Sequence, residues 1–133
     1  MATQEMAAQG AVVELYRREL LKGSTETLIL SLLAEESMYG YQLVKEMGLR
    51  SSGYFHLKEG TLYPALHRLE RNKLVKGRWE DSPTGQSRRY YHITLVGCER
   101  LESMLHEWNL FTKAVNLVAK PISTLASGVV KPR

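Results

Sequence analysis

Hydrogen-bonding and cationic side chains recur along a short segment of the chain, from Gly60 to Asn72. A helix over this segment would place its leucines on one side and these polar side chains on another. Hydroxyl, phenol and imidazole groups can bond to base edges, and arginine can contact phosphates or pair with guanine. The pattern is typical of a helix in the major groove, although an ordinary amphipathic surface helix carries similar residues. The candidates are Thr61, Tyr63, His67, Arg68 and Arg71.

Two further arginines, Arg88 and Arg89, begin a run in which side chains alternate between two faces. The runs 74–80 and 86–93 both have the two-residue period of a strand, and the Ser-Pro-Thr-Gly cluster between them is a turn signal. Together they predict a β-hairpin. Arginines near its tip can contact the DNA backbone or enter a narrow minor groove.

The alternative for the two hairpin arginines is a structural role, in a cross-strand ion pair with an acidic residue such as Glu80 or Asp81. Exposed pairs of this kind are worth only about 0–1 kcal/mol. Pairing and DNA contact are therefore compatible uses of the same side chains.

Positive charge is concentrated in one part of the 133-residue chain. Between Lys58 and Thr94, eight basic side chains face four acidic ones, a surplus of four that equals the net charge of +4. Charge clustered around one helix and one hairpin favours a polyanionic partner over a uniformly solvated surface. Lys58 therefore joins the candidate DNA contacts.

Several other classes of protein are disfavoured. Cys98 is the only cysteine, which fits a reducing cytoplasm, and the apolar runs are too short to span a bilayer. We expect no secretory signal, and the residues hold no phosphate-binding glycine loop or nucleophile elbow. His92, Cys98 and His106 lack a metal-ligand spacing. We expect a cytoplasmic protein that is no enzyme and has no cofactor, metal or membrane partner.

Apolar periodicity and breakers predict the remaining elements. Ser24 and Ser37 are expected to cap helices, Gly48 is expected to end one, and Pro64 is expected in the first turn of another because it lacks an amide hydrogen. The order of helices and strands predicts a mainly α fold: a winged helix-turn-helix with an N-terminal helix and a long C-terminal helix. The expected helices cover 4–21, 25–35, 38–47, 60–72 and 95–120.

The last of these helices has a three-four repeat of apolar residues typical of a coiled-coil seam. Dimer packing is the simpler interpretation of its two aromatic residues. The alternative is an aromatic slot that holds a planar or cationic small molecule. The seam, which we treat as the candidate dimer and effector site, consists of Leu101, Met104, Trp108, Phe111, Val115 and Val118.

The chain resembles the PadR family of bacterial transcriptional regulators from about Leu20 to Val118. The specific stretches are Gly60-Thr61-Leu62-Tyr63-Pro64-Ala65-Leu66 and Arg89-Tyr90-Tyr91-His92-Ile93-Thr94, supported by Tyr39-Gly40-Tyr41. The resemblance implies a homodimeric winged-helix transcription factor, usually a repressor. The chain resembles in particular the small subfamily that has a single C-terminal dimerisation helix.

The resemblance also implies roles for particular residues. The helix with Thr61 and Tyr63 would be the recognition helix, the hairpin with Arg88 and Arg89 would be the wing, and Tyr39 and Tyr41 would approach phosphates. Some members of the subfamily bind flat, lipophilic molecules between protomers beside a tryptophan placed like Trp108. The expected domains are an N-terminal extension (1–22), a DNA-binding domain (23–94), a dimerisation helix (95–120) and a flexible tail (121–133).

These observations predict a sequence-specific DNA-binding regulator whose partners are a double-stranded operator and a second copy of the chain. We expect repression that is relieved by a planar aromatic or cationic effector. The alternative is a winged-helix protein-interaction module that does not bind DNA. Affinity that falls as salt rises would distinguish the first from the second.

Overall fold

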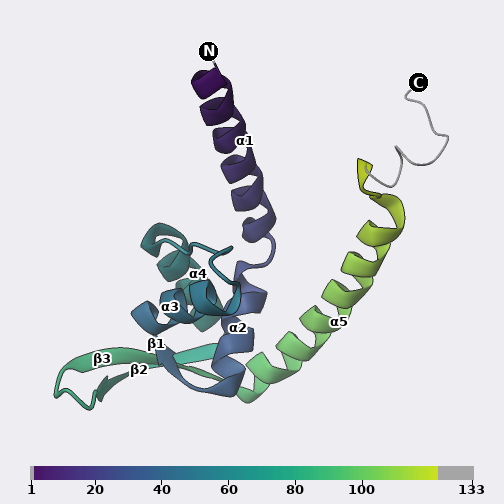
Figure 1. Cartoon of the computed structure of the whole chain (residues 1–133). Helices are drawn as coiled ribbons and strands as arrows, with labels where there is room; N and C mark the ends of the chain where they lie inside the picture. The colour runs from purple at the N-terminus through teal and green to yellow at the C-terminus, as the bar shows by residue number, and fades with distance from the viewer. Residues whose placement is uncertain (1, 123–133) are drawn as a thin grey trace. The chain divides into compact units, whose positions relative to one another are not determined.

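The computed structural model describes residues 2–122 (Figure 1), so most of the tail expected at 121–133 lies outside the described residues. The chain divides into two compact units, one ending at Leu101 and one beginning at Glu102, and each is described by itself. The elements are α1 (Ala2–Lys22), α2 (Thr25–Glu35), β1 (Met38–Tyr39), α3 (Gly40–Arg50), α4 (Glu59–Arg71), β2 (Val75–Asp81), β3 (Ser87–Ile93) and α5 (Leu95–Val118).

The predicted hairpin is confirmed, and a short strand that the sequence did not predict joins it. β2 and β3 pair antiparallel from Val75 opposite Ile93 to Asp81 opposite Ser87. The strand order is β1-β3-β2, with β1 contributing two residues beside β3. Gly85 has a φ of +85°, in the left-handed region that glycine adopts without strain, and thereby allows the turn between β2 and β3.

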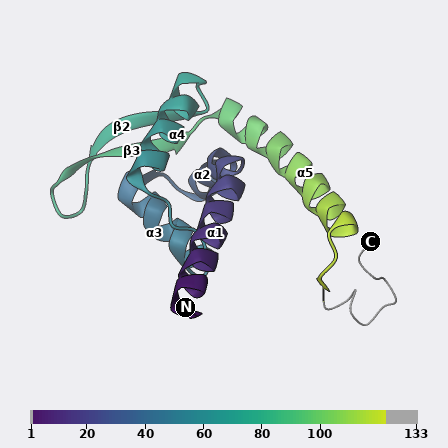
Figure 2. The same cartoon turned by 90° about the horizontal axis from the view of Figure 1, so that it is seen from above.

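The core of the first unit lies between α2, α3, α4 and the base of the sheet. Figures 1 and 2 show the three helices grouped together, with the hairpin extending beyond them. Helix α2 contacts α3, α4 and β3, and α4 also contacts β2. Burial of these apolar side chains stabilises the fold and leaves one side of α4 exposed. The side chains with 0% exposure include Ile29, Leu30, Met38, Leu43, Leu62 and Leu66.

Ser24 is the N-cap residue of α2 as predicted, but its side chain makes no capping hydrogen bond, and the predicted Ser37 cap of α3 does not form. The Ser24 hydroxyl instead donates to the carbonyls of Leu20 and Leu21 in the last turn of α1, at 3.1 and 3.4 Å. Ser37 precedes β1 and its hydroxyl contacts His92, so it is too early in the chain to cap α3.

Helix α3 begins and ends later than predicted. Tyr39 is its N-cap residue, and the Tyr39 backbone N–H donates to Gln42 Oε1 at 3.1 Å. Gly48 does not end the helix, which continues to Arg50. The chain turns instead at Gly53, which has a φ of +82° and donates its backbone N–H to the Gly48 carbonyl at 2.8 Å.

Pro64 lies in the second turn of α4, so its placement in the first turn was wrong. The ring leaves the carbonyl of Gly60, four residues earlier, without its helical amide partner. Both residues are exposed, so water can bond to this carbonyl and the helix continues.

The junction between the hairpin and α5 depends on Thr94 and Gly97. Thr94 Oγ1 donates to the Lys73 carbonyl at 2.7 Å and accepts from the Gly97 backbone N–H at 3.0 Å. A Cβ on Gly97 would lie far inside van der Waals distance of the Leu74 carbonyl oxygen and 2.8 Å from the Ile93 side chain. Only glycine allows the first turn of α5 to approach the backbone this closely.

We expect Gly97→Ala to lower the free energy of unfolding by about 1–3 kcal/mol, because the added methyl group displaces backbone rather than a flexible side chain. Urea denaturation followed by circular dichroism measures this. Gly60→Ala is the matched control: a Cβ there meets nothing within 4 Å, and alanine favours the helix. Equal effects of the two substitutions would contradict the close approach at Gly97.

Candidate nucleic-acid interface

The two sides of α4 differ in burial as predicted. Leu62, Ala65, Leu66 and Leu69 are 0–1% exposed and fix the helix against the core. The opposite side faces away from the core and presents the polar candidates to solvent. These exposed residues are Thr61, Tyr63, His67, Arg68 and Arg71.

Tyr63 is partly a packing residue, because its ring lies against the start of α3. A Cβ on Gly40 would lie 2.5 Å from the Tyr63 hydroxyl oxygen and 3.0 Å from the ring carbon that carries it. The side chain nevertheless remains 39% exposed. Tyr63 therefore sets the approach of α3 and α4 and still has surface available to a ligand.

The two arginines of α4 have different electrostatic surroundings. Arg68 Nε lies 2.9 Å from Glu26 Oε1 on α2, and the two side chains are 48% and 34% exposed. Arg71 has no ion pair within residues 2–122. The charge of Arg68 is partly compensated, whereas that of Arg71 is not.

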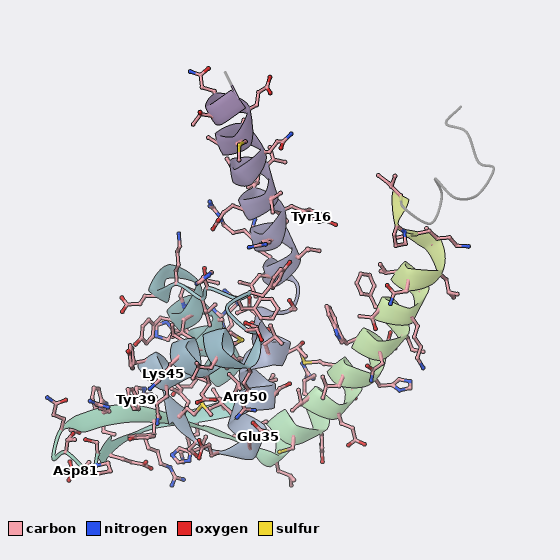
Figure 3. The ribbon with its side chains drawn as sticks, in the orientation of Figure 1. Tyr16, Glu35, Tyr39, Lys45, Arg50 and Asp81 are labelled. Carbon is pink, nitrogen blue, oxygen red and sulfur yellow. The ribbon has the colours of Figure 1, made fainter. Side chains whose placement is uncertain are left out.

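Lys58 is exposed at the N-cap position of α4. With Lys45 and His56 it lines a shallow pocket of about 530 Å³ between α3 and the start of α4. The two lysines add positive charge beside the exposed side of α4. Arg50, at the end of α3, is instead compensated by Glu35 and Glu46, and Figure 3 shows it close to Glu35.

Arg89 connects the hairpin to α4. Its Nη2 lies 2.7 Å from Glu70 Oε2, with the side chains 35% and 31% exposed. The arginine passes over Gly77 of β2, where a Cβ would lie 2.5 Å from Arg89 Nε. The guanidinium is also 5.8 Å from the ring centre of Tyr91, and burial raises the pKa of the Tyr91 phenol while the Arg89 charge opposes this.

The cross-strand alternative for the hairpin arginines is therefore wrong for the described part of the chain. Neither Arg88 nor Arg89 forms an ion pair with Glu80 or Asp81 there. The partner of Arg89 comes from α4, which strand periodicity alone does not reveal. A glycine inside a strand was the available signal, because it often marks a close approach.

Arg88 lies over an aromatic ring on the other face of the hairpin. Its Cζ atom is 4.3 Å from the ring centre of Tyr39, and its Nη2 donates to Gln86 Oε1 at 3.2 Å. Tyr39 stacks against Tyr41, with 6.5 Å between ring centres. The structure thus brings Arg88 of β3 to Tyr39 and Tyr41, which lie far from it in the sequence.

A histidine network that sequence reasoning missed lies at the same face. His92 Nε2 is 3.0 Å from Glu80 Oε1, and His92 Nδ1 hydrogen bonds with the Ser37 hydroxyl. These contacts join the hairpin to the segment before β1. Figure 3 shows Tyr39 beside the middle of the hairpin and Asp81 near the hairpin tip.

The α5 seam is buried at its start and exposed further along the helix. Leu101 is buried, whereas Trp108, Phe111 and Val115 are 42%, 58% and 40% exposed in the single chain. Met104 is intermediate, and Val118 is 86% exposed. The ring centres of Trp108 and Phe111 lie 5.8 Å apart, with 38° between the ring planes. Because both side chains are exposed, they are available to a partner or ligand.

Two kinds of feature are absent from residues 2–122. They contain no helix that is both long and apolar enough to cross a bilayer. They also contain no group of three or more His, Cys, Asp or Glu side chains placed to hold a metal ion.

Three packed helices followed by a hairpin, with a two-residue third strand, define a winged helix-turn-helix protein. Residues 29–103 match the PadR-like family of transcriptional regulators. This match covers more than half of the chain, which therefore belongs to that family. The predicted resemblance and fold are confirmed.

Solved structures of similar proteins agree. A transcriptional regulator from Clostridium thermocellum is 35% identical, with a TM-score of 0.70 over 77% of this chain and 96% of the other. A PadR-like regulator from Bacillus cereus is also 35% identical, with a TM-score of 0.69 over 77% and 98%. A PadR family regulator from Eggerthella lenta is 30% identical, with a TM-score of 0.71 over 85% and 96%.

The contact between Tyr63 and Gly40 predicts a specific coupling. Gly40→Ala should lower the free energy of unfolding by about 1–3 kcal/mol, because its methyl group meets the Tyr63 hydroxyl. Tyr63→Phe should recover part of this loss in the Gly40→Ala protein and change little alone. A double-mutant cycle by chemical denaturation measures the coupling. Strictly additive effects would show that the hydroxyl does not restrict Gly40.

Proposed function

We propose that this chain is a homodimeric, sequence-specific DNA-binding repressor whose affinity for its operator is lowered by a small-molecule effector. The observation that carries the proposal is the exposed polar side of α4, fixed beside a basic hairpin by the Glu70–Arg89 ion pair. Membership of a family of transcriptional regulators supports DNA-binding regulation. Repression is the usual activity that the family resemblance implies.

In the proposed complex, the two α4 helices of a dimer enter successive major grooves about 34 Å apart. Thr61, Tyr63 and His67 would contact base edges from the exposed side of the helix, and Tyr41 would approach phosphates. Lys58 and Arg71, at its two ends, would contact phosphates. Arg88 would add a contact from the hairpin. Arg89 and Arg68 would contribute less charge to DNA because each already has a carboxylate partner.

The proposed dimer uses the α5 seam, whose aromatic residues would otherwise remain in contact with water. Exposed apolar surface of this kind marks interaction sites. A planar or cationic effector would bind against Trp108 and Phe111 between the two copies. It would release DNA only by binding more tightly to a dimer in which the two α4 helices are wrongly spaced.

A fluorescence-anisotropy titration tests DNA binding directly. The duplexes are the intergenic DNA upstream of the chain's own gene and a scrambled sequence, each at two or more salt concentrations. We expect tighter binding to the upstream DNA and affinity that falls as salt rises, because bound phosphates release counterions. Absence of binding to either duplex would favour the protein-interaction module instead.

Variants of the two α4 arginines test which of them contacts DNA phosphates. Arg71→Ala should reduce the salt slope by roughly one unit for each phosphate that Arg71 neutralises. Arg68→Ala is the matched control on the same helix and should reduce the slope less, because Glu26 already compensates its charge. Equal slopes for the two variants would contradict the proposed role of Arg71.

The dimer prediction concerns Trp108 and Phe111. Replacing both with alanine should weaken dimerisation at least about tenfold, because aromatic residues contribute strongly at interfaces. Sedimentation velocity over a concentration series measures this. The control is Leu110→Ala with Leu117→Ala, which removes exposed apolar side chains outside the seam. An aromatic double variant that remains as dimeric as the wild-type protein would place the interface elsewhere.

A further inference from the structure

We propose that Tyr39 is a positioning residue that acts on DNA binding through Arg88. Its ring would hold the Arg88 guanidinium in the orientation that meets a phosphate. This inference rests on the proposed function for its effect on DNA. The contact itself belongs to the free protein, and the two can therefore be tested separately.

The contact between the two residues is direct. The Arg88 Cζ atom lies 4.3 Å from the ring centre of Tyr39, within the distance at which a guanidinium is attracted to an aromatic face. Gln86 Oε1 accepts a hydrogen bond from Arg88 Nη2 at 3.2 Å and restrains the same group from the turn side.

Tyr39 is itself held by the fold on several sides. Its backbone N–H donates to Gln42 Oε1 at the start of α3, and β1 pairs it with Tyr90 of β3. Its ring meets the Tyr90 ring edge-on, with 5.5 Å between centres, and stacks on Tyr41. A ring fixed in this way can restrict an arginine that extends over it.

The nearest acidic residue in the strand register does not compete for Arg88. Glu80 lies directly opposite Arg88 in the β2–β3 ladder, but its carboxylate contacts His92 Nε2 at 3.0 Å. Within residues 2–122, Arg88 forms no ion pair. An aromatic ring can therefore orient Arg88 without neutralising its charge, whereas Glu70 partly neutralises the charge of Arg89.

Orientation before binding favours affinity because fewer side-chain conformations are lost when DNA arrives. Arginine has many rotamers, so an unrestrained Arg88 would lose more entropy on meeting a phosphate. The ring of Tyr39 carries no charge, and its contribution should disappear when Arg88 is absent.

A double-mutant cycle on operator affinity tests this dependence. Tyr39→Leu should weaken binding about three- to tenfold, the range expected when one side chain is no longer restrained, and should have little further effect in an Arg88→Ala protein. Tyr39→Phe keeps the ring and should bind like the wild-type protein. Tyr41→Leu is the matched control: it removes a neighbouring ring that is not under Arg88, and its effect should add to that of Arg88→Ala.

Two outcomes of this cycle overturn the proposal. If Tyr39→Leu weakens binding equally with and without Arg88, then Tyr39 contacts DNA independently. If Tyr39→Phe is as defective as Tyr39→Leu, the hydroxyl matters and the ring does not.

Proton NMR of the free protein tests the contact without DNA. The Arg88 Hδ protons should be shifted upfield by the Tyr39 ring current, retain the shift in Tyr39→Phe and lose it in Tyr39→Leu. Unshifted Arg88 protons in the wild-type protein overturn the proposal even if the leucine variant fails to fold. If the Arg88 protons show the upfield shift but the protein binds no DNA, the proposed function is refuted and the contact between Tyr39 and Arg88 is still supported.

Discussion

The Glu70–Arg89 ion pair is the contact on which the rest of the candidate interface depends, because it joins α4 to the hairpin. Both side chains are about one third exposed, so the pair adds at most about 1 kcal/mol to stability. Its importance is geometric. Gly77 lets the arginine pass close to β2, and the Gly77 backbone N–H lies 3.4 Å from the same carboxylate oxygen. Helix α4 and the hairpin are thereby held in one arrangement.

Neighbouring basic residues consequently serve different purposes. Arg89 and Arg68 are compensated by carboxylates from other elements, whereas Arg71 and Arg88 form no ion pair within residues 2–122. Strand alternation separates Arg88 from Arg89, and the engagement of Glu80 by His92 keeps Arg88 uncompensated. A count of basic residues therefore overstates the charge available to a phosphate backbone and gives no indication of where it is concentrated.

Sequence patterns predicted the helices and strands that are determined by neighbouring residues. The bounds of α2 and the two hairpin strands follow from apolar periodicity and turn residues. β1 was missed because two residues carry no period and become a strand only by pairing with β3. Val75 and Trp79 lie on the same side of β2, yet Val75 is buried and Trp79 is 67% exposed, because the core reaches only the base of the hairpin. The pairing of Glu70 with Arg89 depends on tertiary packing, and the only sign of it in the sequence is the glycine inside β2, Gly77.

The same ion pair limits how an effector could act in the proposed dimer. Because α4 and the hairpin are joined by Glu70 and Arg89, and α3 and α4 meet at Gly40 and Tyr63, a ligand at the seam would displace these elements together rather than distort one of them. Base-reading and phosphate-binding side chains would then lose register with the operator at once. A small change in spacing could therefore weaken several interactions with DNA together, which is the differential affinity between two states that allosteric release requires.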